Sequence, residues 1–457
     1  MNLLHVVHCF PPEPTGGTER VVLSLVRALR ERGHRVRVLA GSLQWERGFR
    51  VDREEHLGIP VIRVRRDDPW FDRWDAAYNP TVEDVFRRVL RRERPDLVHV
   101  HHWIRLTSNL VQIAREEGVP AVVHIHDFHP TCPRTFRVRE DGSFCTESPS
   151  PETCLRCAER WPFQGDQEIR ARLVHYLRDF LNEMRCARMR LAPTESHGRA
   201  VADFFREGIG PVEVLPPGWE EPLQPGRPRG KAGEGPLKVA HWGNLYDLKG
   251  TALLLKAFRR AAGKAPMELV ILGPAVEESF GEELRREARG LPVEFRGKYG
   301  RRDLENLEAH LAVFPSLCRE SYGMALDEAF MLGLPVVVSD AGALPERVGD
   351  GGWVVPRGDG DALAETLERI ALDRSLLEEK ARSVPRTWIT VSEAARRAEE
   401  FYEEILGGGG ESLPPLRPLG YLQRLNLAWF VQALRLSSLL GAKDAWPSGW
   451  RAPEGDS

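Results

Sequence analysis

The 457-residue sequence lacks any run of 18 or more apolar residues, the length that a membrane-spanning helix needs. It also lacks a basic stretch ahead of an apolar N-terminal core, because the opening MNLLHVVHCFPPE is interrupted by His5 and His8, which argues against a secretion signal. Only seven cysteines occur, too few for a disulfide scaffold. These absences predict a folded protein of the reducing cytosol.

An excess of one charge is missing as well. Lys and Arg total 64 and Asp and Glu total 67, so the formal net charge is −3 and the basic footprint of a nucleic-acid-binding protein is absent. We therefore expect no nucleic-acid partner. Gly (41) and Pro (34) are too few for a low-complexity chain. Because the length exceeds that of a single typical core, we expect at least two domains.

What is present is a repeated alternation of strand and helix patterns. Apolar segments such as LLHVVHCF and RVRVLAG alternate with amphipathic stretches, the first of which starts at Thr18 and stops at Gly33. Such alternation predicts parallel sheets covered by helices. We therefore predict an α/β fold of two Rossmann-like domains that face each other across a cleft, with ligands beyond the carboxyl ends of the strands.

A stretch rich in Pro and Gly interrupts this alternation and marks the domain boundary. The predicted order is an N-terminal acceptor-binding domain over 1–215 with a Cys-containing insertion at about 130–160, a linker over 216–236, a nucleotide-sugar-binding domain over 237–385, a helix over 386–406 that returns to the N-terminal domain, and a flexible joint with an amphipathic tail over 407–457. Two interpretations of the tail segment 421–440 stay open: a helix docked on its own protein, or a peripheral contact with the inner face of the membrane.

The richest chemistry lies in FPSLCRESYGMALDEAFMLGLPVVVSD, residues 314–340. Glu320 falls in a loop that leaves a strand, and a helix is expected from Ser321. Its first backbone N–H groups would then be free to bind phosphate or sugar hydroxyls; they belong to Ser321, Tyr322, Gly323 and Met324. Glu328 follows on the same helix among apolar neighbours, where an unpaired carboxylate is costly, so we expect it to hold a ligand.

This stretch resembles the retaining GT-B glycosyltransferases of the glycosyl transferases group 1 family, whose signature is a Glu, seven residues and a second Glu. The matching residues are Pro315, Ser316, Glu320, Tyr322, Gly323, Glu328, Ala329, Gly333, Pro335 and Val336. The resemblance extends from residue 2 to about 405. It implies transfer of a sugar from a nucleotide-diphosphate sugar to a glycan, a lipid-linked saccharide or a small molecule, with Glu320 on the donor sugar and Glu328 on the ribose.

Further donor-site residues follow from the same resemblance. After the first strand of the second domain the family has Gly-Arg and then Lys-Gly, and this chain has Gly243, Asn244, Lys249 and Gly250. Lys249 would neutralise the leaving diphosphate. Asn244 offers no charge, and Arg319 and Arg296 are candidates to compensate for it. In the N-terminal half, the resemblance places Gly16 and Gly17 over the diphosphate.

The His-Asp pair that the family carries at a strand end is matched by His126 and Asp127, with the histidine reaching the donor sugar. His99, His101 and His102 end the preceding strand at the same edge. An inverting transfer would use Asp127 or His126 as the base. The resemblance implies retention instead, with the leaving phosphate oxygen taking the acceptor proton, and because no Asp-x-Asp metal motif occurs at a strand end, we expect no catalytic metal.

Two other functions stay open: a nucleotide-sugar 2-epimerase of the same architecture, and a non-catalytic nucleotide-sugar-binding protein, which Asn244 makes conceivable. The four clustered cysteines need a separate explanation. Cys132, Cys145, Cys154 and Cys157 follow the spacing C-x12-C-x8-C-x2-C, which is compatible with a structural zinc site, with free thiols or with disulfides. Some relatives carry a similar cysteine-bearing insertion at this place.

Overall fold

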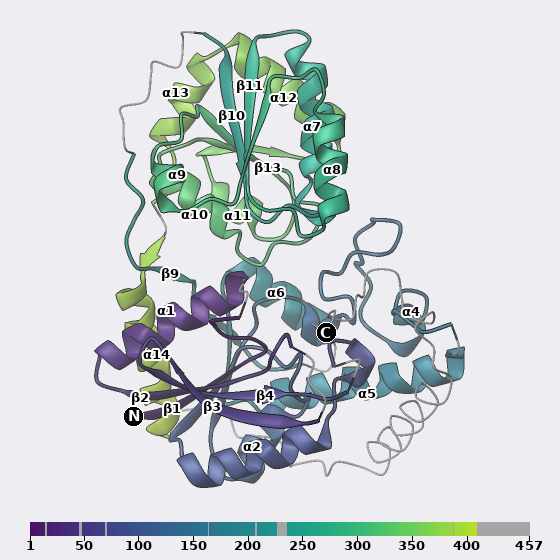
Figure 1. Cartoon of the computed structure of the whole chain (residues 1–457), viewed down its shortest axis with the longest axis vertical. Coiled ribbons are helices and arrows are strands. Elements are labelled where there is room, and N and C mark those ends of the chain that lie inside the picture. Colours follow the sequence, from purple (N-terminus) through teal and green to yellow (C-terminus); the bar gives the residue numbers. More distant parts are fainter. Residues whose placement is uncertain are drawn as a thin grey trace, which may run out of the picture.

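The computed structural model describes residues 1–408 except 14–15, 45–47, 69–70, 163, 206–207, 226–234 and 387. It consists of two α/β domains, one above the other, each built on its own largely parallel sheet (Figure 1). The predicted two-domain Rossmann-like architecture is confirmed. The predicted amphipathic tail segment 421–440 lies outside the described residues.

The N-terminal domain is built on an eight-stranded sheet with the order β3-β4-β2-β1-β5-β6-β7-β8. The pairings between these strands are parallel except that of β3 with β4. Its strands are β1 (Asn2–Val7), β2 (Arg35–Ala40), β3 (Arg50–His56), β4 (Ile59–Arg65), β5 (Leu97–Val100), β6 (Ala121–His124), β7 (Met189–Ala192) and β8 (Val212–Val214). Its helices are α1 (Gly17–Glu31), η1 (Trp74–Ala76), α2 (Pro80–Glu93), α3 (Leu110–Glu116), η2 (His129–Thr131), α4 (Pro151–Cys154), α5 (Asp166–Cys186) and α6 (Glu195–Phe204).

The C-terminal domain is built on a six-stranded parallel sheet with the order β12-β11-β10-β13-β14-β15. The strands are β10 (Leu237–Trp242), β11 (Met267–Leu272), β12 (Val293–Gly297), β13 (Leu311–Phe314), β14 (Val336–Ser339) and β15 (Gly352–Val355). The helices are η3 (Asp247–Lys249), α7 (Thr251–Ala262), α8 (Glu278–Glu287), α9 (Arg301–Glu305), α10 (Met324–Met331), α11 (Leu344–Val348), α12 (Gly360–Leu372) and α13 (Ser375–Arg382). Because β10 and β13 are neighbours, the loops that follow them meet at one edge of the sheet.

The amphipathic pattern of α1 explains its position on the first sheet. Val22, Leu25, Val26 and Leu29 recur at helical spacing and are all buried in one core cluster with residues of β1 and β2. The chain after the helix turns at Gly33, whose φ of +91° is in the left-handed region that glycine adopts without strain.

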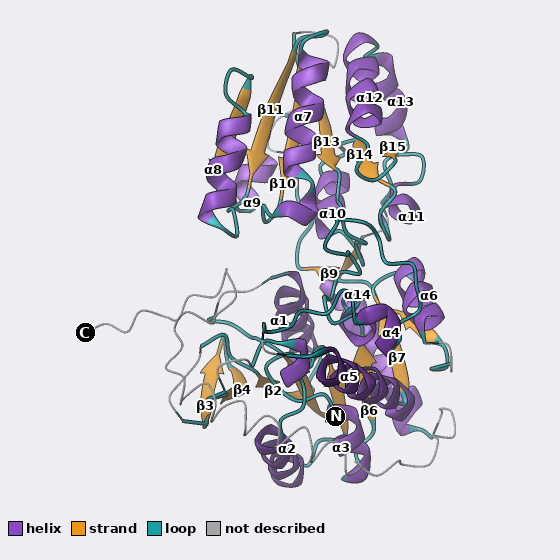
Figure 2. Ribbon diagram, turned by 90° about the vertical axis from the view of Figure 1, so that its right-hand side faces the viewer, coloured by secondary structure: helices purple, strands orange, loops and turns teal. Residues whose placement is uncertain are grey.

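The end of the described chain returns to the N-terminal domain. A short parallel pair of β9 (Gly218–Trp219) and β16 (Ile389–Thr390) marks the crossing, and α14 (Val391–Leu406) then lies beside α1 (Figure 1). Tyr402 of α14 is fully buried, and its hydroxyl lies 2.7 Å from Nδ1 of His99. Figure 2 shows the same junction from the side, with β9 and α14 where the chain passes between the domains.

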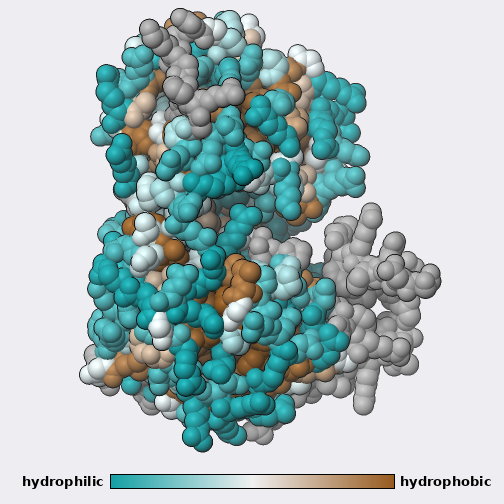
Figure 3. Space-filling model, turned by 60° about the vertical axis from the view of Figure 1, so that its left-hand side comes forward, coloured by the Kyte–Doolittle hydropathy of each residue, from teal (hydrophilic) through white to brown (hydrophobic). Residues whose placement is uncertain are grey.

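The Cys-containing insertion also contacts the second domain. The guanidinium of Arg357 lies 3.6 Å from the ring centre of Phe144 and donates a hydrogen bond to the carbonyl of Gly142. The surface narrows between the two domains (Figure 3). In the described part of the chain, no helix has both the length and the apolar character needed to cross a membrane.

Candidate functional site

Lys249 and Glu320 are brought together where β10 and β13 end. Nζ of Lys249 lies 2.7 Å from Oε1 of Glu320, and the hydroxyl of Ser316 donates to the same oxygen at 2.6 Å. Burial alone would raise the pKa of Glu320, but the ammonium of Lys249 and the Ser316 hydrogen bond hold that pKa below its usual range. Burial opposes the charge of Lys249 too, and the attraction of Glu320 outweighs it and raises the pKa of the ammonium. The pair is therefore ionic at neutral pH.

Gly250 allows the Lys249 turn to approach the Glu320 loop. Its φ is +73°, and a Cβ built on it would lie 2.0 Å from the carbonyl oxygen of Pro315. The two loops are joined by their backbones as well, because the N–H of Leu317 donates to the carbonyl of Leu248 at 2.7 Å. The Lys-Gly pattern thus has a steric cause: only glycine fits between the lysine and the first helical turn of α7.

Replacing Gly250 by alanine should destabilise the protein more than the same change at Gly290. Both glycines have a left-handed φ, +73° and +76°, so each change carries the strain of about 1–2 kcal/mol that a side chain meets there. Nothing lies within 4 Å of the built Cβ at Gly290. Urea unfolding measures the loss of stability in both variants, and the extra loss in Gly250→Ala is the contribution of the backbone clash at Pro315. Equal losses in the two variants would contradict this clash.

Glu328 lies on α10 with one strong partner. The indole N–H of Trp242, the last residue of β10, donates to its Oε2 at 2.7 Å. Burial raises the pKa of Glu328 to about 7, and the Trp242 hydrogen bond and the charge of Arg20 only partly offset this effect. A half-buried carboxyl that titrates near neutrality and has spare acceptor capacity is suited to bind ligand hydroxyls.

A buried network around Asp327 holds the Glu320 loop and α10 in place. Asp327 is completely buried and accepts from the Tyr322 hydroxyl at 2.8 Å, from the Trp219 indole at 2.7 Å and from the Arg347 guanidinium. Arg347 also donates to the carbonyls of Tyr322 and Gly323 at 3.0 and 3.1 Å. The Tyr322 side chain is therefore committed to this network, and only its backbone remains for a donor.

The predicted helix start at Ser321 was wrong, because α10 begins at Met324. Gly323 has a φ of +80°, and the carbonyl of Glu320 accepts from the N–H of Ala343 at 2.8 Å instead of starting a helix. A Cβ at Gly323 would lie 2.9 Å from Leu344, so packing against α11 favours glycine there. The free N–H groups of the helix start at Met324, and Ser321 to Gly323 form a turn before it.

The Gly16-Gly17 loop lies across from α10. A Cβ built on Gly17 would lie 3.5 Å from Sδ of Met324, which places the loop against the first residue of that helix. The N–H of Gly16 donates to Glu19 at 2.9 Å, and Glu19 also contacts Nε2 of His8 at 2.9 Å. Burial would raise the pKa of Glu19, but the His8 hydrogen bond outweighs it and lowers the pKa to about 2. The loop is thus anchored from its own helix.

The domains also touch beside the Glu320 loop. The hydroxyl of Thr194 donates to the carbonyl of Ser321 at 2.9 Å, and the N–H of Ser196 donates to Glu346 at 2.9 Å. Both donors lie at the start of α6, where Thr194 is the N-cap. The first turn of α6 thereby joins the N-terminal domain to the loop that carries Glu320.

His126 and Asp127 belong to a large histidine cluster of the N-terminal domain. Nε2 of His126 lies 3.0 Å from Nδ1 of His101, and Asp127 contacts Nε2 of His102 at 3.2 Å and accepts from the N–H of His129 at 2.8 Å. Asp127 would have its pKa raised by burial, but the neighbouring His102 lowers it well below the usual range. Within the described residues, no hydrogen bond or ion pair joins His126 or Asp127 to Lys249 or Glu320.

Asn244 is the uncharged residue at the family's arginine position, and the two arginines predicted to compensate for it lie on β12 and in the loop directly before Glu320. Asn244 is exposed at the end of β10, next to Gly243, whose φ is +133°. Arg296 is paired with Glu294 at 2.8 Å on β12, and the guanidinium of Arg319 lies 5.0 Å from the ring centre of Phe144. Arg20 is the cation that the sequence reasoning missed: from the start of α1, its charge lowers the pKa of Glu328.

The four insertion cysteines are all free thiols in the structure. Cys154 contributes to the raised pKa of Cys132 and of Cys157, and Cys145 contributes to the raised pKa of Cys154, although burial is the largest cause for each thiol. The four thiols therefore lie in one neighbourhood. Within the described residues, the groups of three or more ligand atoms that lie within 4.8 Å of one another are both made of histidines.

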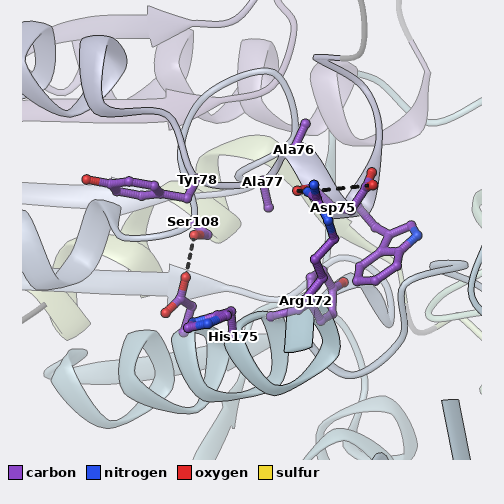
Figure 4. Close-up of a pocket in the computed structure, with 10 residues that line it drawn as sticks. Asp75, Ala76, Ala77, Tyr78, Ser108, Arg172 and His175 are labelled. Atoms are coloured by element: carbon purple, nitrogen blue, oxygen red, sulfur yellow. Dashed lines mark hydrogen bonds and ion pairs between the residues drawn. The ribbon is translucent and has the colours of Figure 1, made fainter. Parts of the chain in front are cut away.

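A pocket on the N-terminal domain lies apart from the donor residues. It is lined by residues of η1, the segment that follows it and α5, as Figure 4 shows. Arg172 donates to the carbonyl of Asp75 at 3.1 Å, and Ser108 donates to Asp179 at 2.9 Å. Because Arg172 and Asp179 are already engaged in these bonds, we assign the pocket no role.

Comparison with known proteins decides the family. Residues 15–220 match the family described as Glycosyltransferase Family 4, and residues 236–373 match the family described as Glycosyl transferases group 1. The chain belongs to the GT-B glycosyltransferases. The predicted family is thereby confirmed, and the two matches divide the GT-B enzyme close to the observed crossing between its domains.

Individual relatives of this GT-B glycosyltransferase are distant. It is 27% identical to D-inositol 3-phosphate glycosyltransferase of Saccharomonospora viridis over an aligned stretch of 299 residues. The alignment covers 61% of this chain and 62% of that relative, which is less than two thirds of the relative's length. Sucrose-phosphate synthase from Thermosynechococcus elongatus has a TM-score of 0.63 at 17% identity, covering 90% of this chain and all of that one. HepE from Anabaena, solved in complex with UDP, has a TM-score of 0.58 at 18% identity, and the match covers 88% of this chain and all of HepE. The two solved structures show the shared fold.

Besides Arg20, three residues that lie beside the two glutamates of this GT-B glycosyltransferase were not predicted from sequence. Trp242 binds Glu328, Thr194 binds the Glu320 loop, and Tyr299, which follows β12, is close enough to Glu328 for that carboxylate to contribute to its raised pKa, after burial. Trp242 and Tyr299 each follow or end a strand of the second sheet, so their position beyond the carboxyl ends of strands was the available signal.

Proposed function

We propose that this enzyme transfers a sugar from a nucleotide-diphosphate sugar to a saccharide or lipid-linked acceptor with retention of the anomeric configuration. The observation that supports it most is the ion pair of Lys249 and Glu320 at 2.7 Å, at the meeting point of the loops after β10 and β13. A carboxylate beside a cation provides both an acceptor for sugar hydroxyls and a positive charge for a diphosphate. Two groups of opposite charge would thus contact the two halves of the donor.

Each donor contact can be assigned to a group of the site. Glu320 accepts hydrogen bonds from the donor sugar, and Lys249 neutralises the charge that develops on the diphosphate as the glycosidic bond breaks. Glu328 accepts from the ribose hydroxyls. The N–H groups at the start of α10 and the Gly16-Gly17 loop approach the phosphates from opposite sides. Arg20 stands in for the family arginine that Asn244 replaces.

The diphosphate leaving group takes the proton in this proposal, so no side-chain base is required. Asp127 fits this account because it is already bound by His102 and by the His129 N–H. NMR of the product anomer tests it: retention is expected, whereas an inverted product would assign a base to the N-terminal domain. Free isomerised sugar without an acceptor would identify a 2-epimerase, and binding without turnover a binding protein.

Nucleotide affinity should rise with pH across neutrality. Ribose hydroxyls donate to a carboxylate, so binding favours the ionised form of Glu328, whose pKa is about 7 in the free protein. Between pH 6 and 8 the ionised fraction grows about tenfold, and the affinity should grow by up to that factor. Calorimetric titration of UDP at both pH values measures it. In Glu328→Gln this component should vanish, and an unchanged pH dependence in that variant would contradict the assignment.

We further propose that turnover needs no metal and that the four insertion cysteines hold a structural zinc ion. Dialysis against EDTA at room temperature should leave the initial rate unchanged if the first part holds. Elemental analysis of the purified chain tests the second part, because a protein free of zinc and iron would leave the cysteines as thiols.

We propose that the protein is cytosolic and that its tail, residues 421–440, contacts the inner face of the membrane. Such a contact would favour a lipid-linked acceptor. Co-sedimentation with anionic liposomes, compared between the whole chain and a chain ended at Gly408, measures it. Loss of binding on truncation is expected, and equal partitioning of the two chains would contradict it.

A further inference from the structure

Eight of the fourteen histidines gather where β1, β5 and β6 end in the N-terminal domain. They are His5, His8, His99, His101, His102, His124, His126 and His129, and neighbouring rings are stacked or tilted against one another at centroid distances from 4.1 to 5.7 Å. The proposed transfer reaction uses at most His126 of this set. The other rings are buried polar groups in the core, and the proposed sugar transfer gives no reason for burying them there.

Several ring nitrogens of the cluster are buried without a partner. His124 is 1% exposed, and neither of its ring nitrogens has a hydrogen-bond partner. A buried polar atom left without a partner costs about 1–3 kcal/mol. The backbone of Leu215 lies close to the His124 ring, but no hydrogen bond of normal geometry satisfies either nitrogen.

Three nitrogens of the cluster are arranged like ligands of one ion. His101, His124 and His126 each place a ring nitrogen within 4.8 Å of the other two, and Nδ1 of His101 lies 3.0 Å from Nε2 of His126. A tetrahedral ion with metal–nitrogen distances of about 2.0–2.1 Å separates its ligand nitrogens by about 3.3–3.4 Å. A small opening of this pair would accommodate the ion.

We propose that His101, His124 and His126 bind a divalent transition-metal ion of the zinc type. Imidazole is a preferred ligand of such ions, and His126 is only half buried, which gives the ion a route from the surface. The site lies wholly in the N-terminal domain, and His126 is the one member that the resemblance also places near the donor sugar.

The surroundings of His101 fit this role. Nδ1 faces His126, and Nε2 lies 3.0 Å from Nδ1 of His5, so a metal-bound His101 would donate its remaining proton to His5.

A second group of three, His5, His99 and His101, meets the same distance criterion. Its members are completely buried, and Nδ1 of His99 is already paired with the Tyr402 hydroxyl at 2.7 Å. The group around His124 is preferred because neither nitrogen of His124 makes a hydrogen bond of normal geometry and because His126 is only partly buried. The two groups share His101, so a test must separate them through their other members.

The test uses the full-length chain without an affinity tag, carrying Cys154→Ser and Cys157→Ser so that thiolates of the insertion do not compete. Zn²⁺ titrated by calorimetry should bind with one equivalent, and His124→Ala should weaken binding by at least about 100-fold. His99→Asn should leave it within about threefold. Retained affinity in His124→Ala, or a loss confined to His99→Asn, would overturn the proposal, as would the absence of any stoichiometric binding.

Because a buried substitution can prevent folding, a second measurement needs no histidine variant. X-ray absorption at the zinc edge of the loaded Cys154→Ser, Cys157→Ser protein should show a shell of nitrogen and oxygen atoms only, with the multiple scattering of three imidazoles. A sulfur shell, or fewer than three imidazoles, would overturn the site. The circular dichroism of the metal-free protein serves as the folding control for both experiments.

Discussion

Replacing Lys249 by alanine should lower kcat by about 100- to 1000-fold. Lys249 is the cation that lies against Glu320, and its ammonium would stabilise charge on the diphosphate chiefly as the bond to the sugar breaks. Removal of one such preorganised donor typically costs this factor in turnover. The change also leaves the buried carboxylate of Glu320 without its cation, so the pKa of Glu320 should rise. A partly protonated Glu320 should accept weaker hydrogen bonds from the sugar hydroxyls.

Lys256 offers a matched control for this experiment. It lies on α7, two turns after Lys249, and is exposed. Lys256→Ala should keep both kcat and KM within about twofold, because exposed substitutions away from special features have small effects. Initial rates with the native donor, measured as release of the nucleotide, provide the comparison. If both alanine variants retained full turnover, Lys249 would have no part in the chemistry.

The second large effect is expected at Asp327, and it concerns stability. Asp327→Ala should lower the free energy of unfolding by about 3–5 kcal/mol, because breaking a buried ion pair leaves the Arg347 guanidinium uncompensated. The Tyr322 hydroxyl and the Trp219 indole would lose their acceptor as well. Since these groups hold the loop between Glu320 and α10, donor binding should fall along with stability.

The control for Asp327 is Asp361, a carboxylate of α12 that is paired with Arg260 on the surface. Asp361→Ala should change the free energy of unfolding by no more than about 1 kcal/mol, the range of exposed ion pairs. Urea denaturation of the two variants gives the comparison. Equal losses for the two changes would show that the Asp327 network does not carry the stability assigned to it.

The fold could be predicted because it depends on local patterns. Apolar strands alternate with amphipathic helices in both halves, and the Pro- and Gly-rich stretch separates them, so two parallel-sheet domains follow from composition and periodicity. The Glu-x7-Glu frame and the Lys-Gly pair predicted Glu320, Glu328 and Lys249 as site residues. The observed pairing of Lys249 with Glu320 joins two segments that follow the neighbouring strands β10 and β13.

The remaining parts of the site depend on contacts between distant segments. The start of α10 was misplaced because the left-handed turn at Gly323 is set by Leu344 and by the Glu320–Ala343 hydrogen bond, which no local pattern reveals. The commitment of Tyr322 to Asp327 and Trp219 was invisible for the same reason. The histidine cluster arises only because the sheet order places β1, β5 and β6 side by side.

The central claim is that Glu328 and the groups around it form a nucleotide site, and thermal unfolding with UDP, GDP and ADP tests it most directly. A ligand at about 100 times its Kd adds about 2.7 kcal/mol to the stability of the folded protein. One of these nucleotides should raise the Tm of the native chain, and Glu328→Ala should lose most of that increase. A native chain that no nucleotide stabilises, or a Glu328→Ala variant that keeps the whole increase, would contradict the account.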